Sequence, residues 1–141
     1  MVEGSFLFID DELIQHKILS HTVRDLGYDN QIIDFYNGLE ALNYLRTESG
    51  KIFLIISDIH MPVMNGLQLK EEIESDPLLK KKAIPFIFYS SSGKLEEIEK
   101  AYSLGIQGYL DKFNDVATAK DSLQKVIECW SVFVHPSKYN I

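Results

Sequence analysis

Four short apolar runs in this chain lead directly to polar residues that can take part in chemistry. The pairings are residues 6–9 with Asp10 and Asp11, residues 52–56 with Asp58, residues 86–89 with Ser90, and residues 109–110 with Lys112. Short continuous apolar runs are typical of strands that are covered on both faces. Because parallel strands direct their carboxyl ends to one edge of a sheet, these polar side chains are expected to meet at that edge.

Apolar residues recur at helical spacing between these runs. The first helical segment covers residues 14–26 and stops at Gly27, and another ends at Gly105, since glycine commonly terminates helices. A third must end before Pro77, because the residue before a proline disfavours the helical conformation. The expected strands, each followed by a helix, are residues 6–9, 32–35, 52–57, 86–89 and about 107–110.

Five strands alternating with five helices predict an α/β fold with a doubly wound parallel sheet of the flavodoxin-like type. Right-handed crossovers and ordinary connection lengths favour the strand order 2-1-3-4-5. In that order strands one and three are neighbours, so Asp10, Asp11 and Asp58 come together at the topological switch point. The basic run at 80–82 is expected to lie in a solvated loop.

Composition narrows the classes of protein that this chain can be. Its 141 residues fit one domain, with a core over about 5–134 and a short tail at 135–141. With 45% apolar and 25% charged residues, it is expected to be globular.

The net charge of −7 argues against binding to nucleic acid or to anionic lipid. No apolar stretch approaches the ~20 residues of a membrane span, and no cationic leader is present, so a cytoplasmic location is expected. Cys129 is expected to be a buried thiol in the last helix.

Converging carboxylates repel one another strongly unless a cation joins them. Oxygen ligands in an open pocket favour Mg²⁺, which takes one or two carboxylates and keeps several waters. Asp11 and Asp58 are the expected direct ligands, with Asp10 acting through a bound water. The main-chain oxygen of His60 is expected to lie within reach of the same ion. The alternative is that Asp10 or Asp11 caps the following helix, but a cap does not explain the third acid.

Asp58 is also the candidate nucleophile, because a carboxylate can attack a phosphoryl group to give an acyl phosphate. Lys112 is expected to balance the charge on the phosphoryl oxygens. Ser90 offers a hydroxyl that can donate to one of those oxygens. Taken alone, Lys112 would be an exposed loop lysine and Ser90 part of a serine-rich loop; their positions after strands favour the functional interpretation.

Together these residues resemble a response-regulator receiver domain, the phosphoacceptor of two-component signalling. The resemblance covers about residues 6–134 and includes the spacing D-x-x-M-P-x-x-x-G that begins at Asp58. It implies that Asp58 is phosphorylated, that Asp10 and Asp11 bind Mg²⁺, and that Ser90 and Tyr109 act as the switch pair. Phosphorylation would then change the surface of the fourth helix, fifth strand and fifth helix. The implied partners are a histidine kinase or phosphotransfer protein and a downstream protein target.

The end of the chain carries a further expectation. Only seven residues follow position 134, too few for an output domain, so the chain is expected to be a stand-alone receiver that signals by protein contact and not a turnover enzyme. It resembles single-domain receivers that serve phytochrome-type and hybrid kinases. Trp130, Phe133 and Val134 either form a homodimer patch or seal the core, and the sequence leaves both open.

One residue departs from the family pattern. Receivers usually carry proline after the lysine, with a cis peptide bond, whereas Phe113 follows Lys112 here. A cis bond before a non-proline residue costs about 2.5–4 kcal/mol, so a trans bond and a rearranged loop are expected. A pseudo-receiver that is never phosphorylated is therefore one rival. A flavodoxin-like electron carrier and an aspartyl-phosphate phosphatase of the haloacid-dehalogenase type are the others, but the segment Asp10-Asp11-Glu12 suits neither.

Overall fold

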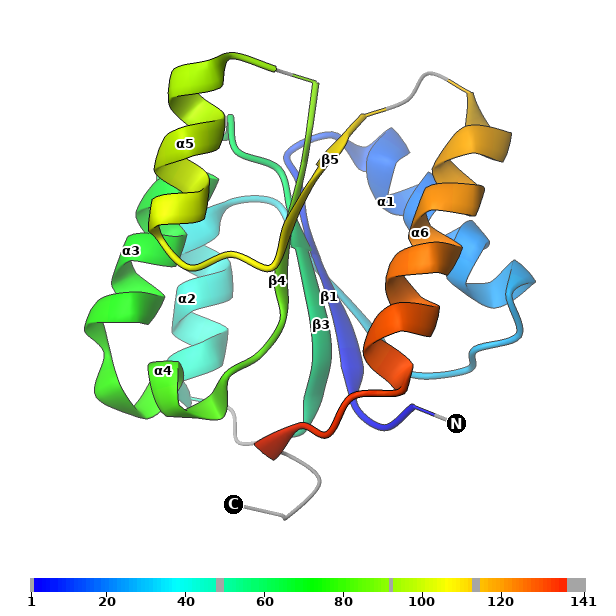
Figure 1. Ribbon diagram of the computed structural model, residues 1–141, viewed down its shortest axis with the longest axis horizontal. Helices are drawn as coiled ribbons and strands as arrows, with labels where there is room; N and C mark the ends of the chain where they lie inside the picture. Colours follow the sequence, from blue (N-terminus) through cyan, green and yellow to red (C-terminus); the bar gives the residue numbers. More distant parts are fainter. Residues whose placement is uncertain (1, 48–49, 92, 113–114, 137–141) are drawn as a thin grey trace.

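Figure 1 shows the computed structural model, which describes residues 2–47, 50–91, 93–112 and 115–136. Five parallel strands form one sheet in the order β2-β1-β3-β4-β5, so the predicted fold class and strand order are confirmed. The strands are β1 (Ser5–Ile9), β2 (Ile32–Phe35), β3 (Ile52–Ser57), β4 (Phe86–Ser90) and β5 (Gly108–Asp111). The helices in the described ranges are α1 (Leu13–Asp25), α2 (Gly38–Thr47), α3 (Gly66–Ser75), α4 (Pro77–Lys82), α5 (Leu95–Ser103) and α6 (Val116–Ser131).

Helices cover both faces of the sheet, which explains why its central strands are continuously apolar. In Figure 1, α1 and α6 lie on one face, and α2, α3, α4 and α5 lie on the other. Successive residues of a strand point to opposite faces. Accordingly Phe6 and Phe8 join the core beneath α1 and α6, while Leu7 and Ile9 join the core beneath the other helices. All four side chains are at most 1% exposed.

The structure contains a sixth helix, α4, where the sequence analysis placed a solvated loop. Asp76 caps α4, accepting hydrogen bonds from the amides of Leu78 and Leu79 at 3.1 and 3.3 Å. Pro77 is the first residue of the helix, where its missing N–H is not needed. The run 80–82 is thus the basic last turn of α4, where positive charge complements the helix dipole. The loop prediction was wrong because proline was treated as a break and not as a helix start.

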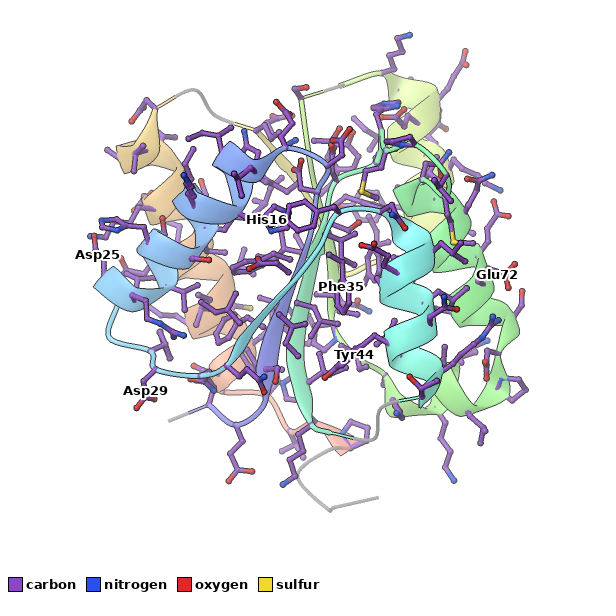
Figure 2. The ribbon with its side chains drawn as sticks, turned by 180° about the vertical axis from the view of Figure 1, so that it is seen from behind. His16, Asp25, Asp29, Phe35, Tyr44 and Glu72 are labelled. Atoms are coloured by element: carbon purple, nitrogen blue, oxygen red, sulfur yellow. The ribbon has the colours of Figure 1, made fainter. Side chains whose placement is uncertain are left out.

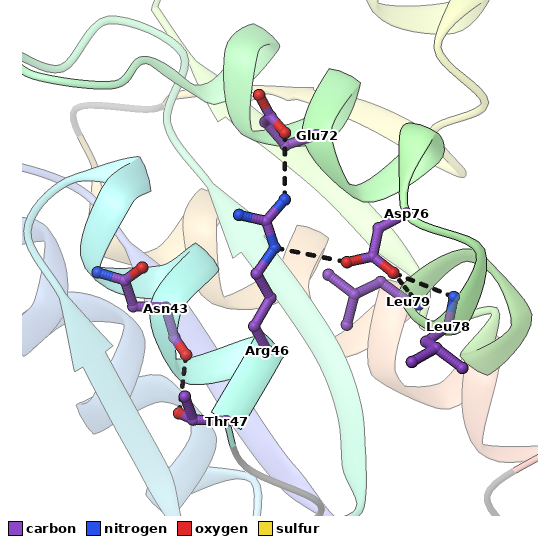
Figure 3. Close-up of polar contacts among 7 residues, drawn as sticks. All are labelled: Asn43, Arg46, Thr47, Glu72, Asp76, Leu78 and Leu79. Atoms are coloured by element: carbon purple, nitrogen blue, oxygen red, sulfur yellow. Dashed lines mark hydrogen bonds and ion pairs between the residues drawn. The ribbon is translucent and has the colours of Figure 1, made fainter.

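Arg46 connects α2 to α3 and to the residue between α3 and α4 (Figure 3). Its guanidinium lies 3.2 Å from the Glu72 carboxylate and 3.4 Å from the Asp76 carboxylate. Exposed ion pairs of this kind contribute only about 0–1 kcal/mol. The apolar contacts of Leu42, Leu69 and Leu79 beneath them therefore hold these helices together.

The end of α6 combines buried and exposed side chains. Trp130 packs against the core under α1 and α6, whereas Phe133 and Val134 are 51% and 65% exposed. Cys129 is exposed, so the expectation of a buried thiol was wrong. The helix turns Leu123 and Ile127 toward the sheet, and Cys129 lies on another side. No helix in the described part of the chain is both long and apolar enough to cross a membrane.

Strand register brings the polar residues to one edge. Ile9 of β1 pairs with Ser57 of β3, so the residues that follow each of them emerge side by side. The amide of Asp58 donates to the carbonyl oxygen of Ile9 at 2.7 Å. On the other side, the amide of Lys112 donates to the carbonyl oxygen of Ser90 at 3.0 Å. The carboxyl ends of β1, β3, β4 and β5 thus form one continuous rim, at the top of Figure 1.

Candidate functional site

Lys112 joins two buried carboxylates at this rim. Its ammonium nitrogen lies 2.8 Å from Oδ2 of Asp10 and 3.2 Å from Oδ2 of Asp58. A third acid, Glu12, is 3.7 Å away and largely exposed. Asp10 is 2% exposed and Asp58 6%, so bulk water has little access to either residue. The structure therefore brings together three residues that the sequence placed after three different strands.

The two oxygens of Asp58 have different surroundings. Oδ1 accepts a hydrogen bond of 2.8 Å from the amide of Ile59, which fixes the orientation of the carboxylate. Oδ2 points to Lys112. The carbonyl oxygen of Asp58 accepts from the hydroxyl of Ser57 at 2.8 Å, which holds the peptide that follows. One oxygen is thus anchored, and the other is presented beside a cation.

Burial and charge shift the pKa values of this pair. Burial raises the pKa of Asp10 above its ordinary value of 3.8, and the hydrogen bond from Lys112 offsets this only in part. Burial also acts to lower the pKa of Lys112. The hydrogen bond and charge of Asp10, with those of Asp58, outweigh that effect, so the pKa of Lys112 lies above 10.5. The ammonium is therefore fully charged at neutral pH.

Replacing Asp10 with asparagine is expected to stabilise the protein at neutral pH when divalent cations are absent. A raised carboxyl pKa means that this group favours folding below pH 3.8, and that the contribution is lost as pH rises through the folded-state pKa. We expect Asp10→Asn to increase the free energy of unfolding by about 1 kcal/mol in urea titrations with a chelator. The gain should vanish below pH 3.8, and Asp111→Asn, at the exposed end of β5, should show none. Lower stability of Asp10→Asn at neutral pH would contradict this assignment.

The acid cluster has the chemistry of a divalent-cation site. Asp10, Asp11 and Glu12 each place one carboxylate oxygen within 4.8 Å of the others. Asp10 is buried, and the other two are exposed to water, which suits an ion that keeps several waters. Asp58 is not a member of this close group; it faces the pocket from β3, across Lys112. All donors are oxygens, so the residues present fit Mg²⁺.

Helix capping does not account for the acid pair. α1 begins at Leu13 and its N-cap residue is Glu12, whose side chain makes no capping hydrogen bond. Asp10 Oδ1 instead accepts from the amide of Glu12 at 2.9 Å, which turns the chain out of β1. Asp11 is exposed, and it is neither the N-cap residue of α1 nor the acceptor for the amide of Glu12. The capping alternative is therefore excluded for both residues.

His16 supports the acid pair from α1 and was not anticipated from the sequence. The ring is 3% exposed and lies where α1 crosses the ends of β1 and β2 (Figure 2). Nε2 is 2.7 Å from the carbonyl oxygen of Asp10, and Nδ1 is 2.7 Å from Oδ1 of Asp34. A carbonyl oxygen can only accept, so Nε2 must carry a hydrogen. His16 thus ties the backbone of Asp10 to β2.

The opposite side of the pocket contains the residues expected to form the switch. Ser90 is 1% exposed at the end of β4. Tyr109 is half-buried on β5, and its hydroxyl donates to Oε1 of Glu97 at 3.2 Å. Burial raises the pKa of the Tyr109 phenol, and a hydrogen bond with the Ser90 side chain acts in the opposite direction. The two predicted switch residues therefore lie close enough for Ser90 to affect the pKa of Tyr109.

His60 was expected to contribute only its main-chain oxygen. Its side chain, two residues after Asp58, reaches α5, where Nε2 lies 2.9 Å from Oε2 of Glu97. Glu97 therefore contacts two residues of the predicted site, although nothing in the sequence marked it. Phe113 lies outside the described residues, so the expected trans bond and rearranged loop after Lys112 stay predictions.

Similarity to characterised proteins agrees with this geometry. A family model described as the response regulator receiver domain matches residues 6–127. Chemotaxis protein CheY-3 of Vibrio cholerae is 34% identical over 123 residues, which are 86% of this chain and 90% of that protein. The probable transcriptional regulator ycf29 of Pyropia yezoensis is 34% identical over 106 residues, which are 75% of this chain and 45% of that protein.

Solved structures share the fold. The phosphorylated cyanobacterial phytochrome response regulator RcpA superposes with a TM-score of 0.86 at 23% identity, covering 96% of this chain and 99% of that one. The Mn²⁺-bound form of response regulator Rcp1 gives a TM-score of 0.84 at 21% identity, with coverage of 95% and 99%. The family match spans most of the chain, and this chain therefore belongs to the response regulator receiver domain family of two-component signalling.

Proposed function

We propose that this protein accepts a phosphoryl group on Asp58 in a Mg²⁺-dependent reaction and signals through the resulting change in its surface. The observation that carries the proposal is the asymmetry of the Asp58 carboxylate. Oδ1 is held by the amide of Ile59, while Oδ2 is presented to the ammonium of Lys112. A buried carboxylate in a fixed orientation beside a permanent cation is suited to attack at phosphorus.

The transfer itself needs few groups. An oxygen of Asp58 forms a bond to phosphorus, and the bond from phosphorus to the donor nitrogen or oxygen breaks, leaving its electron pair on the donor. Lys112 balances the negative charge of the phosphoryl oxygens, and Ser90 can donate a hydrogen bond to one of them. Asp10, Asp11, Asp58 and the main-chain oxygen of His60 would hold Mg²⁺, which when bound supplies further positive charge to those oxygens. The fold relative Rcp1 was solved with Mn²⁺, which supports a divalent cation.

Signalling would follow from the switch pair. Phosphorylation adds about −1.5 to −2 units of charge to the pocket. A hydrogen bond from Ser90 to the phosphoryl group would draw Ser90 away from Tyr109 and change the surface of α5, β5 and α6. Because α4 was not expected from the sequence, α5 and α6 are the fourth and fifth helices of the sequence-based prediction. The phosphoryl donor would be a histidine kinase or phosphotransfer protein, and the changed surface would be recognised by a downstream protein. The protein would thus act as a switch and not as a turnover enzyme.

Incubation with Mg²⁺ and acetyl phosphate tests this function directly. We expect the intact mass of the unmodified protein to increase by one phosphoryl group, and Asp58→Asn to show no increase. Asp111→Asn is the matched control, because it removes the same charge from an exposed residue at the same rim. A folded protein that gains no phosphoryl group would overturn the proposal and favour a receiver that acts by binding alone. An Asp58→Asn variant that gains one would also overturn it, because the acceptor would then be another residue.

A further inference from the structure

Glu97 lies between the loop that follows Asp58 and the tyrosine of β5. Its side chain is 13% exposed, so the carboxylate is largely removed from water. Oε2 is 2.9 Å from Nε2 of His60, and Oε1 accepts the hydroxyl hydrogen of Tyr109 at 3.2 Å. Each oxygen therefore has its own partner, and the partners come from β5 and from the loop after β3.

A shielded carboxylate needs such partners. Losing one partner of a largely buried charge leaves that charge uncompensated, which is costly. The neighbours of Glu97 on α5 have no comparable environment, since Glu96 is exposed. Glu97 therefore links His60 to Tyr109, the residue of β5 that was predicted to act in the switch with Ser90. His60 follows Asp58 by two residues, and Tyr109 lies on β5, three residues before Lys112.

We propose that Glu97 is a positioning residue that holds His60 and Tyr109 in the arrangement of the unphosphorylated protein. This inference rests on the proposed phosphorylation of Asp58. A phosphoryl group on Asp58 competes with Glu97 for the donor on His60, and it draws Ser90 away from Tyr109. The phosphorylated arrangement is therefore reached only by breaking or weakening contacts to Glu97. By linkage, contacts that stabilise one arrangement weaken the binding of any ligand that favours the other.

Glu97→Gln removes the charge and one of the two acceptor oxygens while preserving shape. The NH2 group that replaces this oxygen cannot accept a hydrogen bond, so in the present geometry either the contact with His60 or the one with Tyr109 is lost. Glu96→Gln is the matched control, with the same loss of charge at an exposed position one residue earlier. The probe is beryllofluoride with Mg²⁺, a phosphoryl analogue that binds carboxylates, and its affinity is measured by isothermal titration calorimetry.

We expect Glu97→Gln to bind the analogue about three- to tenfold more tightly than the unmodified protein, which corresponds to the net contribution of one ordinary hydrogen bond. Glu96→Gln should bind with unchanged affinity. In the background of Tyr109→Phe, which already lacks the hydroxyl, the effect of Glu97→Gln should shrink. Weaker or unchanged binding by Glu97→Gln, or an undiminished effect in that background, would overturn the inference.

Two further readouts separate the alternatives. A purely structural role would lower the unfolding midpoint of Glu97→Gln without increasing analogue affinity, which also contradicts the inference. If the unmodified protein and Glu96→Gln both fail to bind the analogue, or bind it equally well with Asp58 replaced, the proposed function fails and the inference falls with it. Analogue binding that depends on Asp58, with equal affinities for Glu97→Gln and Glu96→Gln, would refute the inference alone.

Discussion

Lys112→Gln is expected to bind Mg²⁺ more tightly and yet to be phosphorylated about a hundredfold more slowly. In the present structure the ammonium occupies the space between Asp10 and Asp58, 2.8 and 3.2 Å from their carboxylates. Removing it makes the pocket more negative by one unit within a few ångströms of the ion. At that distance one unit of charge is worth ~1–4 kcal/mol, so an increase in Mg²⁺ affinity of about tenfold or more is expected.

The rate of phosphorylation is expected to fall in Lys112→Gln, although Mg²⁺ affinity rises. The phosphoryl oxygens carry negative charge into the same pocket, and Lys112 is the fixed cation that balances it. Mg²⁺ affinity from calorimetry and the rate of mass gain with acetyl phosphate are the two measurements. Lys120→Gln provides the control, since Lys120 pairs on the surface with Asp25, the last residue of α1, whereas α1 begins at the rim. Weaker Mg²⁺ binding by Lys112→Gln would show that the lysine organises the acids and does not compete with the ion.

The sheet could be predicted because its signals are local. β1 and β3 are buried on both faces, so their sequences are continuously apolar, and the expected spans 6–9 and 52–57 nearly coincide with Ser5–Ile9 and Ile52–Ser57. Strand order then followed from handedness and connection length. α4 was missed because six residues carry too little periodicity and because Pro77 has two meanings, as a helix break and as a helix start.

The residues that follow the strands at the rim could be predicted because the strands themselves could be. Asp10 and Asp58 follow the neighbouring strands β1 and β3, and Lys112 follows β5, two strands further along the same edge, so strand order places all three on one rim. His16 and Glu97 could not be found in this way. Both lie on helices, and their partners are defined only when the helix packs on the sheet: His16 with Asp34, and Glu97 with His60. Such contacts depend on tertiary geometry that no short spacing in the sequence encodes.

Gly66, the glycine of the motif that begins at Asp58, lies where the backbone and a buried ring leave no room for a side chain. Gly66 is the first residue of α3, and its amide donates to the carbonyl oxygen of Ile59 at 2.8 Å. A Cβ atom at position 66 would lie 2.3 Å from the carbonyl oxygen of Asp58 and 2.7 Å from Cε1 of Phe88. The first contact is backbone, and the second is a ring with no exposed surface, so neither can move aside cheaply.

Gly66→Ala is therefore expected to lower the free energy of unfolding by about 3 kcal/mol and to slow phosphorylation of Asp58 in the remaining folded protein. Alanine favours helices over glycine by about 1 kcal/mol, so propensity alone predicts the opposite sign. Gly50→Ala, where a Cβ meets nothing within 4 Å, is the matched control and should change stability little. Denaturant titrations measure both variants. If Gly66→Ala were as stable as the unmodified protein, α3 could start farther from Asp58, and the glycine would not be needed for the close approach that positions the phosphoacceptor.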